Sequence, residues 1–201
     1  MALSVPETRL IDLMPPAFEE GLDDWSTGNG TPDSRTYEGA AHVRLVSGDG
    51  DFGACLEMRK IETVQRLRYM AELPIPPGAC IEISARLKVL RGPRPGARIA
   101  IWPGGPSGQA VSDLPNEGPI TLTPRHGGIK LVRAVIGPAP RPGIDLVWDG
   151  RAVYAHVGLD LVGPDGGVVR IERIRVREVS ESDAAPGPCP GQAAWLPRGA
   201  Q

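Results

Sequence analysis

The sequence has few cysteines, few aromatic residues and no long hydrophobic run. The three cysteines, Cys55, Cys80 and Cys189, show none of the paired spacings of zinc sites, and an odd number cannot all pair within the chain. We therefore expect reduced thiols, with a Cys55–Cys80 disulfide as the alternative. No stretch approaches the roughly 20 apolar residues of a membrane-spanning helix, which argues against membrane insertion.

An excess of positive charge is also lacking. The formal net charge is −2, which argues against general nucleic-acid binding because that function needs a broad basic surface. The first residues, Met1 to Glu7, have no basic segment followed by an apolar core, so they do not form a secretory signal. We expect a protein made in the cytoplasm without a signal peptide.

Glycine and proline are abundant, with 26 and 22 residues respectively, whereas 41% of the chain is hydrophobic. Both residues are costly inside helices, and no segment has sustained helical periodicity. Short β-type runs separated by turn residues instead predict an all-β, antiparallel β-sandwich of the jelly-roll type. The predicted strands are 42–47, 54–60, 65–71, 80–90, 97–102, 120–123, 129–136, 144–148, 153–161 and 168–179.

Alternation within the strands predicts which side chains face the core, because neighbouring strand residues point to opposite sides. In 80–90 the odd-numbered residues are apolar, and in 153–161 the odd-numbered residues are again apolar. Tyr154, His156 and Trp102 fall on the outward side of their strands. The last strand changes phase between Ile171 and Ile174, which predicts a β-bulge near Glu172 and Arg173.

Flanking segments differ from this body in composition. We predict an N-terminal docking arm over 1–17, a sandwich domain over 18–180 and a Pro/Gly-rich tail over 181–201 that cannot build its own core. The alternative for the arm is a strand added to the domain's own edge. Candidate partners of the arm and tail are other subunits of an assembly, including a second copy of the chain.

The opening residues Phe18-Glu19-Glu20-Gly21-Leu22-Asp23-Asp24-Trp25, the segment Gly78 to Lys88 and the closing Val169 to Ile174 resemble carbohydrate-binding modules with a galactose-binding-like jelly roll. The resemblance covers about 18–179 and rests on the order and spacing of strand patterns. It implies a two-layered sandwich that binds polysaccharide without catalysis.

Three further segments are similar to modules of bacterial pectate-lyase-like proteins and to head-spike proteins of phage-like gene transfer agent particles. They are Leu67-Arg68-Tyr69-Met70, Asp145-Leu146-Val147-Trp148 and Gly158-Leu159-Asp160-Leu161. This resemblance implies adhesion to capsular polysaccharide by a released, virion-like particle. A structural subunit or connector of an assembly is the alternative.

Members of the wider jelly-roll family often hold a structural calcium ion between the opening and closing strands. The matching positions are Glu19 and Glu172, whose carboxylates are the hard oxygen ligands that calcium prefers. Arg173 beside a cation is unfavourable, so two ordinary surface carboxylates are the alternative.

Residues for sugar binding are present, whereas catalytic motifs are absent. The sequence has no His-Glu-x-x-His, Cys-x-x-Cys, phosphate-binding loop or nucleophile elbow. Aromatic rings can stack on a pyranose, and Arg adds charge pairing to an acidic polymer. A polysaccharide lyase or hydrolase remains the less favoured alternative.

We predict that one sheet face carries Arg66, Arg68, Arg86, Arg98, Trp102, Trp148, Tyr154 and His156. Packing in the core is the alternative for Trp148 and the favoured prediction for Trp25.

Overall fold

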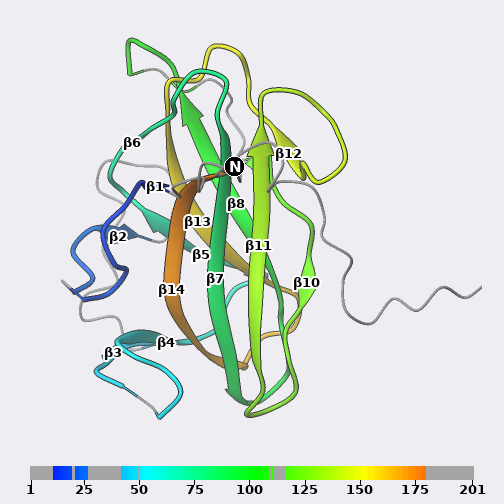
Figure 1. The fold of residues 1–201 in the computed structure, drawn as a ribbon. Helices are drawn as coiled ribbons and strands as arrows, with labels where there is room; N and C mark the ends of the chain where they lie inside the picture. The colour runs from blue at the N-terminus through cyan, green and yellow to red at the C-terminus, as the bar shows by residue number, and fades with distance from the viewer. Residues whose placement is uncertain are drawn as a thin grey trace, which may run out of the picture.

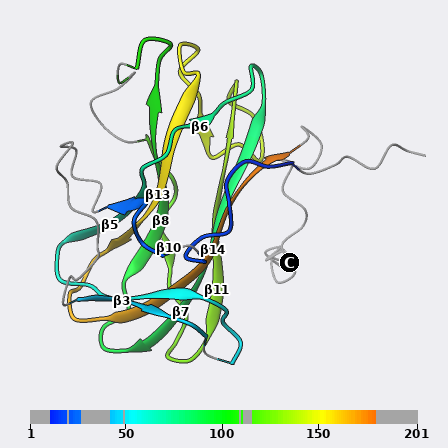
Figure 2. The ribbon, with the colours of Figure 1, turned by 90° about the vertical axis from the view of Figure 1, so that its left-hand side faces the viewer.

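The computed structural model describes residues 11–19, 21–26, 42–48, 50–108, 110 and 116–179. They form two β-sheets packed face to face, as the edge-on view in Figure 2 shows. The fold is therefore the expected all-β sandwich, and every strand pairing is antiparallel except that of the short edge strand β12 with β11.

One layer, sheet A, is at the front in Figure 1 and has the order β12-β11-β7-β14-β4-β3, with β1 also paired to β14. Its long central strands, β7 and β14, come from the middle and the end of the described chain. The strands are β1 (Ile11–Asp12), β3 (Val43–Val46), β4 (Cys55–Arg59), β7 (Cys80–Arg91), β11 (Ile129–Gly137), β12 (Leu146–Val147) and β14 (Val168–Val179).

The other layer, sheet B, has the order β10-β8-β13-β5-β2, with β6 paired to β13 and β9 paired to β8. Its centre is β13, which is hydrogen-bonded to β8 on one side and to β5 on the other. The strands are β2 (Trp25–Ser26), β5 (Val64–Tyr69), β6 (Leu73–Pro74), β8 (Gly96–Gly104), β9 (Asn116–Glu117), β10 (Thr121–Leu122) and β13 (Tyr154–Val162).

The core lies between the layers and consists of the apolar side of each strand, as alternation predicted. The odd-numbered residues of β7 from Ile81 to Val89 are buried, as are those of β13 from Ala155 to Leu161. Val153 is an exception, because it precedes β13 and is exposed. Trp25 is buried against Phe18 and Tyr69, which confirms the prediction that it belongs to the core.

The predicted bulge in the last strand is present. On β14, Glu172 lies opposite Arg86 and Arg175 lies opposite Ser84, so β14 has one residue more than β7 across this interval. Arg173 has a φ of 47°, in the left-handed region. The bulge lets both apolar pairs reach the core, because Val169, Ile171, Ile174 and Val176 are all buried.

One buried lysine joins the connections that cross between the layers at the lower end in Figure 1. Lys60 follows β4, and its ammonium group donates to the carbonyl oxygen of Gly163 and to Asp165, each at 2.6 Å. Gly163 and Asp165 belong to the turn from β13 to β14, so Lys60 clamps the β4–β5 and β13–β14 connections together. Its side chain is fully buried, which is tolerated only because the charge is paired and hydrogen-bonded.

Residues 11–17 lie against the domain. Ile11 and Asp12 pair with Glu178 and Arg177 of β14, and Leu13 donates its backbone N–H to Val176. This part of the arm adds a strand to the domain's own sheet, in line with the alternative interpretation. Residues 1–10 and the tail 181–201 lie outside the described residues, so the domain boundaries stay a prediction.

Two of the three cysteines, Cys55 and Cys80, lie among the described residues. Cys55 and Cys80 are both buried, and β14 lies between their strands, so they are not joined in a disulfide. Within the part of the chain that the structure describes, no helix is long and apolar enough to cross a membrane.

Candidate functional site

The outward side of sheet B collects four of the predicted residues, which we call the ring face: Arg68, Trp102, Tyr154 and His156. Strand register brings them together. Trp102 on β8 lies opposite His156 on β13, whereas Arg68 on β5 lies opposite Gly158, two residues further along β13. The Arg68 guanidinium carbon is 4.9 Å from the centroid of the Trp102 ring, and the Tyr154 and His156 rings meet edge to face at 5.7 Å.

Glycines beneath the rings allow them to lie close to the sheet. A Cβ at Gly104 would be 2.0 Å from Cζ of Tyr154, so that ring occupies the space that a side chain would need. A Cβ at Gly158 would be 3.1 Å from Cζ3 of Trp102 and 2.2 Å from the Leu67 carbonyl oxygen. Both positions therefore require glycine for the rings to hold these places.

Arg68 is the cation of the ring face. Among the described residues no carboxylate pairs with it, and its buried Nε has no hydrogen-bond partner. Burial lowers the pKa of Arg68, and the charge of Arg66 lowers it further, whereas Tyr154 raises it. An arginine nevertheless stays charged at neutral pH, so Arg68 can donate hydrogen bonds to a ligand.

His156 is neutral on this face. Burial lowers its pKa, the positive charge of Arg68 lowers it further, and hydrogen bonds to the backbone of Ala71 and Met70 act in the opposite direction. Its Nδ1 lies 3.2 Å from the Ala71 carbonyl oxygen, which can only accept, so Nδ1 carries the proton. The Nε2 atom is then an acceptor suited to a hydroxyl group.

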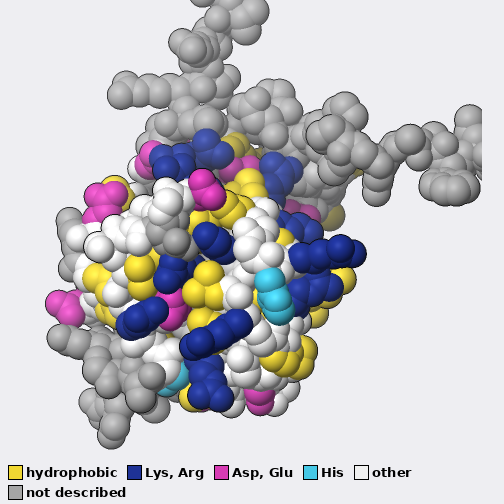
Figure 3. All heavy atoms as spheres, turned by 90° about the horizontal axis from the view of Figure 1, so that it is seen from below, with side chains coloured by type: hydrophobic (Ala, Val, Ile, Leu, Met, Phe, Trp, Pro, Cys, Tyr) yellow, Lys and Arg dark blue, Asp and Glu magenta, His cyan; other side chains and the backbone are white. Residues whose placement is uncertain are grey.

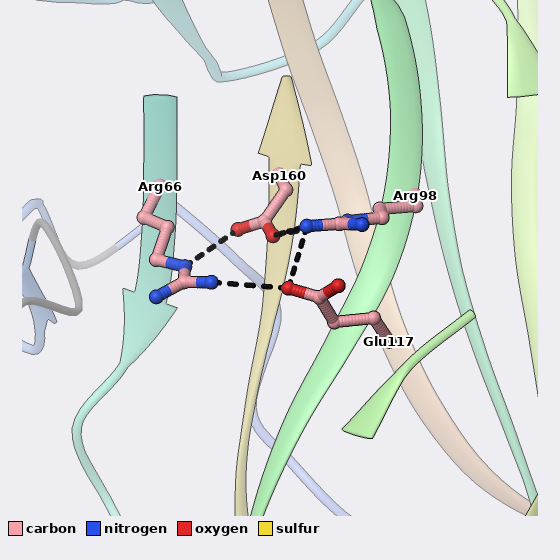
Figure 4. Close-up of polar contacts among 4 residues, drawn as sticks. All are labelled: Arg66, Arg98, Glu117 and Asp160. Carbon is pink, nitrogen blue, oxygen red and sulfur yellow. Dashed lines mark hydrogen bonds and ion pairs between the residues drawn. The ribbon is translucent and has the colours of Figure 1, made fainter. Parts of the chain in front are cut away.

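Arg66 and Arg98 are already engaged by carboxylates, as Figure 4 shows. Arg66 Nε donates to Asp160 at 3.1 Å, and Arg98 donates to the other oxygen of Asp160 at 3.2 Å. Glu117 of β9 accepts from both arginines, at 3.2 Å and 2.5 Å. The Asp160 carboxylate is fully buried beneath them, so this network joins β5, β13, β8 and β9 rather than offering open hydrogen-bonding groups.

Glu117 and the supporting glycines were missed at the sequence level. Glu117 lies in a strand of two residues with no readable pattern, and Gly104 and Gly158 gain a role only through the rings that cover them. Asp160 lies on the same side of β13 as Tyr154 and His156, and a carboxylate at this position is the signal that could have been matched to the arginines Arg66 and Arg98 on the neighbouring strands.

Two predicted residues do not join the ring face, so the expectation of a single face is wrong for them. Arg86 lies on β7 of sheet A, where it pairs with the buried Glu172 and packs on the Phe52 ring. Trp148 follows the edge strand β12 of sheet A and is partly buried against the core, which agrees with the alternative interpretation.

The predicted calcium ligands line one cavity of about 520 Å³ beside the arm, but they fit a calcium ion poorly. The Glu172 carboxylate is held by Arg86 and by the backbone N–H of Gly53, so a guanidinium group already supplies its positive charge. Arg173 and Arg175 line the same cavity. Among the described residues, no group of three or more His, Cys, Asp or Glu could hold a metal ion. The calcium site stays a prediction that this geometry does not favour.

The sequence matches no protein-family model and no curated protein. Solved structures nevertheless share the fold. The CBM22-1 xylan-binding domain of Paenibacillus barcinonensis Xyn10C is 12% identical, with a TM-score of 0.54 over 85% of this chain and 96% of that domain. The CBM22-1-GH10 modules of Clostridium thermocellum Xyn10B complexed with xylohexaose are 10% identical, with a TM-score of 0.54 over 85% of this chain and 29% of theirs.

A bacteriophage domain is also similar. Tailspike protein 4 of bacteriophage CBA120, an enzymatically active domain, is 14% identical with a TM-score of 0.49, and the match covers 80% of this chain and 20% of that chain. The chain thus spans about a fifth of the tailspike domain. The structural similarity to the xylan-binding modules shows the fold, a sandwich like those of carbohydrate-binding modules. At identities this low, the ligand has to be inferred from the chemistry of the site.

Proposed function

We propose that this chain is a non-catalytic protein that binds polysaccharide through its ring face. The proposal rests on four side chains that lie together on the outward face of sheet B: Arg68, Trp102, Tyr154 and His156. Among the described residues, no carboxylate pairs with Arg68. Rings supply apolar surface for a pyranose, Arg68 supplies donors and His156 supplies an acceptor. The similarity in fold to xylan-binding modules supports this assignment.

Substitution on the ring face tests the proposal. Trp102→Ala removes the stacking surface and Arg68→Ala removes the donors, so we expect each to weaken binding to the recognised glycan about tenfold or more. Neither side chain is fully buried, so both variants should unfold near the wild-type temperature. The measurement is a glycan array followed by isothermal titration calorimetry.

A matched control is Arg133→Ala, on the outward side of the other sheet. It should leave glycan affinity unchanged. Wild-type affinity in both ring-face variants would show that the glycan binds elsewhere.

The strand patterns that resemble those of head-spike proteins also suggest in which particle the chain is found. We propose that the chain is part of a released phage-like gene transfer agent particle and grips capsular polysaccharide of a recipient cell. Mass spectrometry of purified particles should find the chain among their proteins, and a capsule pull-down should retain it. Its absence from the particles would leave the glycan-binding proposal intact and remove this location. Particle assembly without binding to any polysaccharide would favour the structural subunit.

A further inference from the structure

A second group of cations lies at the lower end of the molecule, away from the ring face. We call it the basic end and define it as Arg59, Arg91, Arg94 and Arg125. Figure 3 views the molecule from this end and shows Lys and Arg side chains spread across it. The whole chain carries a net charge of −2, so this concentration is local.

The pairing of three strands brings two arginines together at the centre of the basic end. Arg59 of β4 and Arg91 of β7 both lie opposite Val168 of β14, one on each side. Adjacent strands are about 5 Å apart, which places the two arginine Cα atoms about 10 Å apart. Both guanidinium groups can therefore reach an anionic group that lies over Val168.

A cavity occupies this position. It has a volume of about 360 Å³, and its lining includes His42, Arg59, Arg91 and the apolar Val43 and Val168. Its volume lies in the range of small-ligand sites. Apolar side chains beside arginines suit a sugar ring that carries an acidic group.

The nearby carboxylates of Glu57 and Asp165 do not neutralise these arginines. Glu57 also lines the cavity, but it is held between Arg44 and Arg170. Asp165 is paired with Lys60. Among the described residues, Arg59, Arg91, Arg94 and Arg125 form no ion pair.

The neighbouring turns carry the two remaining cations. Arg94 belongs to the turn after β7, and Arg125 belongs to the turn before β11. The two turns are hydrogen-bonded, because His126 Nε2 lies 2.8 Å from the Gly92 carbonyl oxygen and Gly127 donates to Val89. Arg125 is thus held beside the strand end that bears Arg91, and the positive charge extends beyond the cavity.

We propose that the basic end is a second binding site, which takes the anionic groups of an acidic polysaccharide. Carboxylate and sulfate groups suit guanidinium donors, which bind them with two parallel hydrogen bonds. A nucleic acid is less suited because no Phe, Tyr or Trp among the described residues lines this cavity, so it offers little surface on which bases could stack.

The test uses the full chain with polygalacturonate as the probe, its methyl ester as the neutral analogue and a single-stranded DNA oligonucleotide as the competing polyanion. The variant is Arg59→Gln/Arg91→Gln, and the control is Arg175→Gln, which removes one positive charge from another exposed arginine on the outward side of sheet A. Affinities are measured by calorimetry at low and moderate salt.

We expect the double variant to bind polygalacturonate at least about tenfold more weakly, whereas Arg175→Gln binds like the wild type. Added salt should weaken binding, and the methyl ester should not bind at this end. An equal loss in Arg175→Gln would overturn the proposal in favour of diffuse attraction, and so would undiminished binding by the double variant. Tighter binding of the oligonucleotide through the same arginines would overturn the choice of ligand.

The Trp102→Ala variant separates this proposal from the previous one. Binding of polygalacturonate that persists in Trp102→Ala and is lost in Arg59→Gln/Arg91→Gln belongs to the basic end. Loss in Trp102→Ala alone would assign the acidic polymer to the ring face and contradict a second site. If the ring face does not bind glycan, Trp102→Ala will instead bind every glycan with the affinity of the wild type.

Discussion

Among single side chains, Asp160 determines which arginines of sheet B are available to a ligand. Its buried carboxylate holds Arg66 and Arg98, so those two cations are committed to the fold. Arg68 is one alternation further along β5, where the opposite residue of β13 is Gly158 and offers no carboxylate. A difference of two residues along one strand thus separates a structural arginine from one that can bind.

The lowered pKa of His156 has a consequence for stability. An unfolded histidine titrates near 6.5, whereas burial and Arg68 lower the pKa in the folded state. As the pH falls below the unfolded-state pKa, His156 binds a proton in the unfolded chain but not yet in the folded chain. The free energy of unfolding therefore decreases as the pH falls, until the pH passes the folded-state pKa of His156. Urea unfolding from about pH 7 to about pH 5 should show this loss.

The variant His156→Gln isolates this contribution from those of His42 and His126. It should lose less stability than the wild type over the same pH interval, because glutamine does not titrate. Parallel stability curves for the two proteins would mean that the pKa of His156 is not lowered by folding.

At the scale of one strand, the bulge at Arg173 keeps the two halves of β14 in phase with the core. Deleting Arg173 would turn either Val169 and Ile171 or Ile174 and Val176 away from the interior. Each exposed side chain costs about 1.5–3 kcal/mol, so a pair costs a large share of a typical domain stability of about 5–15 kcal/mol. We expect the deletion to abolish cooperative unfolding, as followed by circular dichroism.

Arg173→Gly is the control for the deletion. It keeps the residue count and suits the positive φ, so its stability should stay within about 1 kcal/mol of the wild type. A deletion variant that unfolds cooperatively at the wild-type midpoint would contradict the role given to the bulge.

Strand patterns explain what could be read from the sequence. All ten predicted segments overlap a strand, because long alternating runs such as 80–90 have a clear period of two. The strands β1, β2, β6 and β9 have two residues each, too few to show any period. Alternation also tells which side of its own strand a residue faces but not which sheet the strand joins, which is why Arg86 was grouped with the ring face.

At the scale of the whole molecule, the Arg86–Glu172 pair bears on metal dependence. Because Arg86 supplies the cation for Glu172, EDTA should shift the melting temperature by less than the roughly 2–4 °C that corresponds to 1 kcal/mol in a domain of this size. Arg86→Gln should lower it clearly, since Glu172 then keeps a buried charge without its partner, at a cost of about 3–5 kcal/mol.

Calorimetry with EDTA, with added calcium and with neither decides the matter. A melting temperature that falls in EDTA and recovers with calcium would establish a calcium site at Glu19 and Glu172 despite the guanidinium group beside it.

The clamp made by Lys60 has a mechanical consequence. It links two of the connections that cross between the layers at one end, β4–β5 and β13–β14, so these connections cannot separate without removing an ammonium group from its carbonyl and carboxylate partners. We therefore expect local opening of the sandwich to cost more free energy at this end than at the opposite end, which native-state hydrogen exchange would measure.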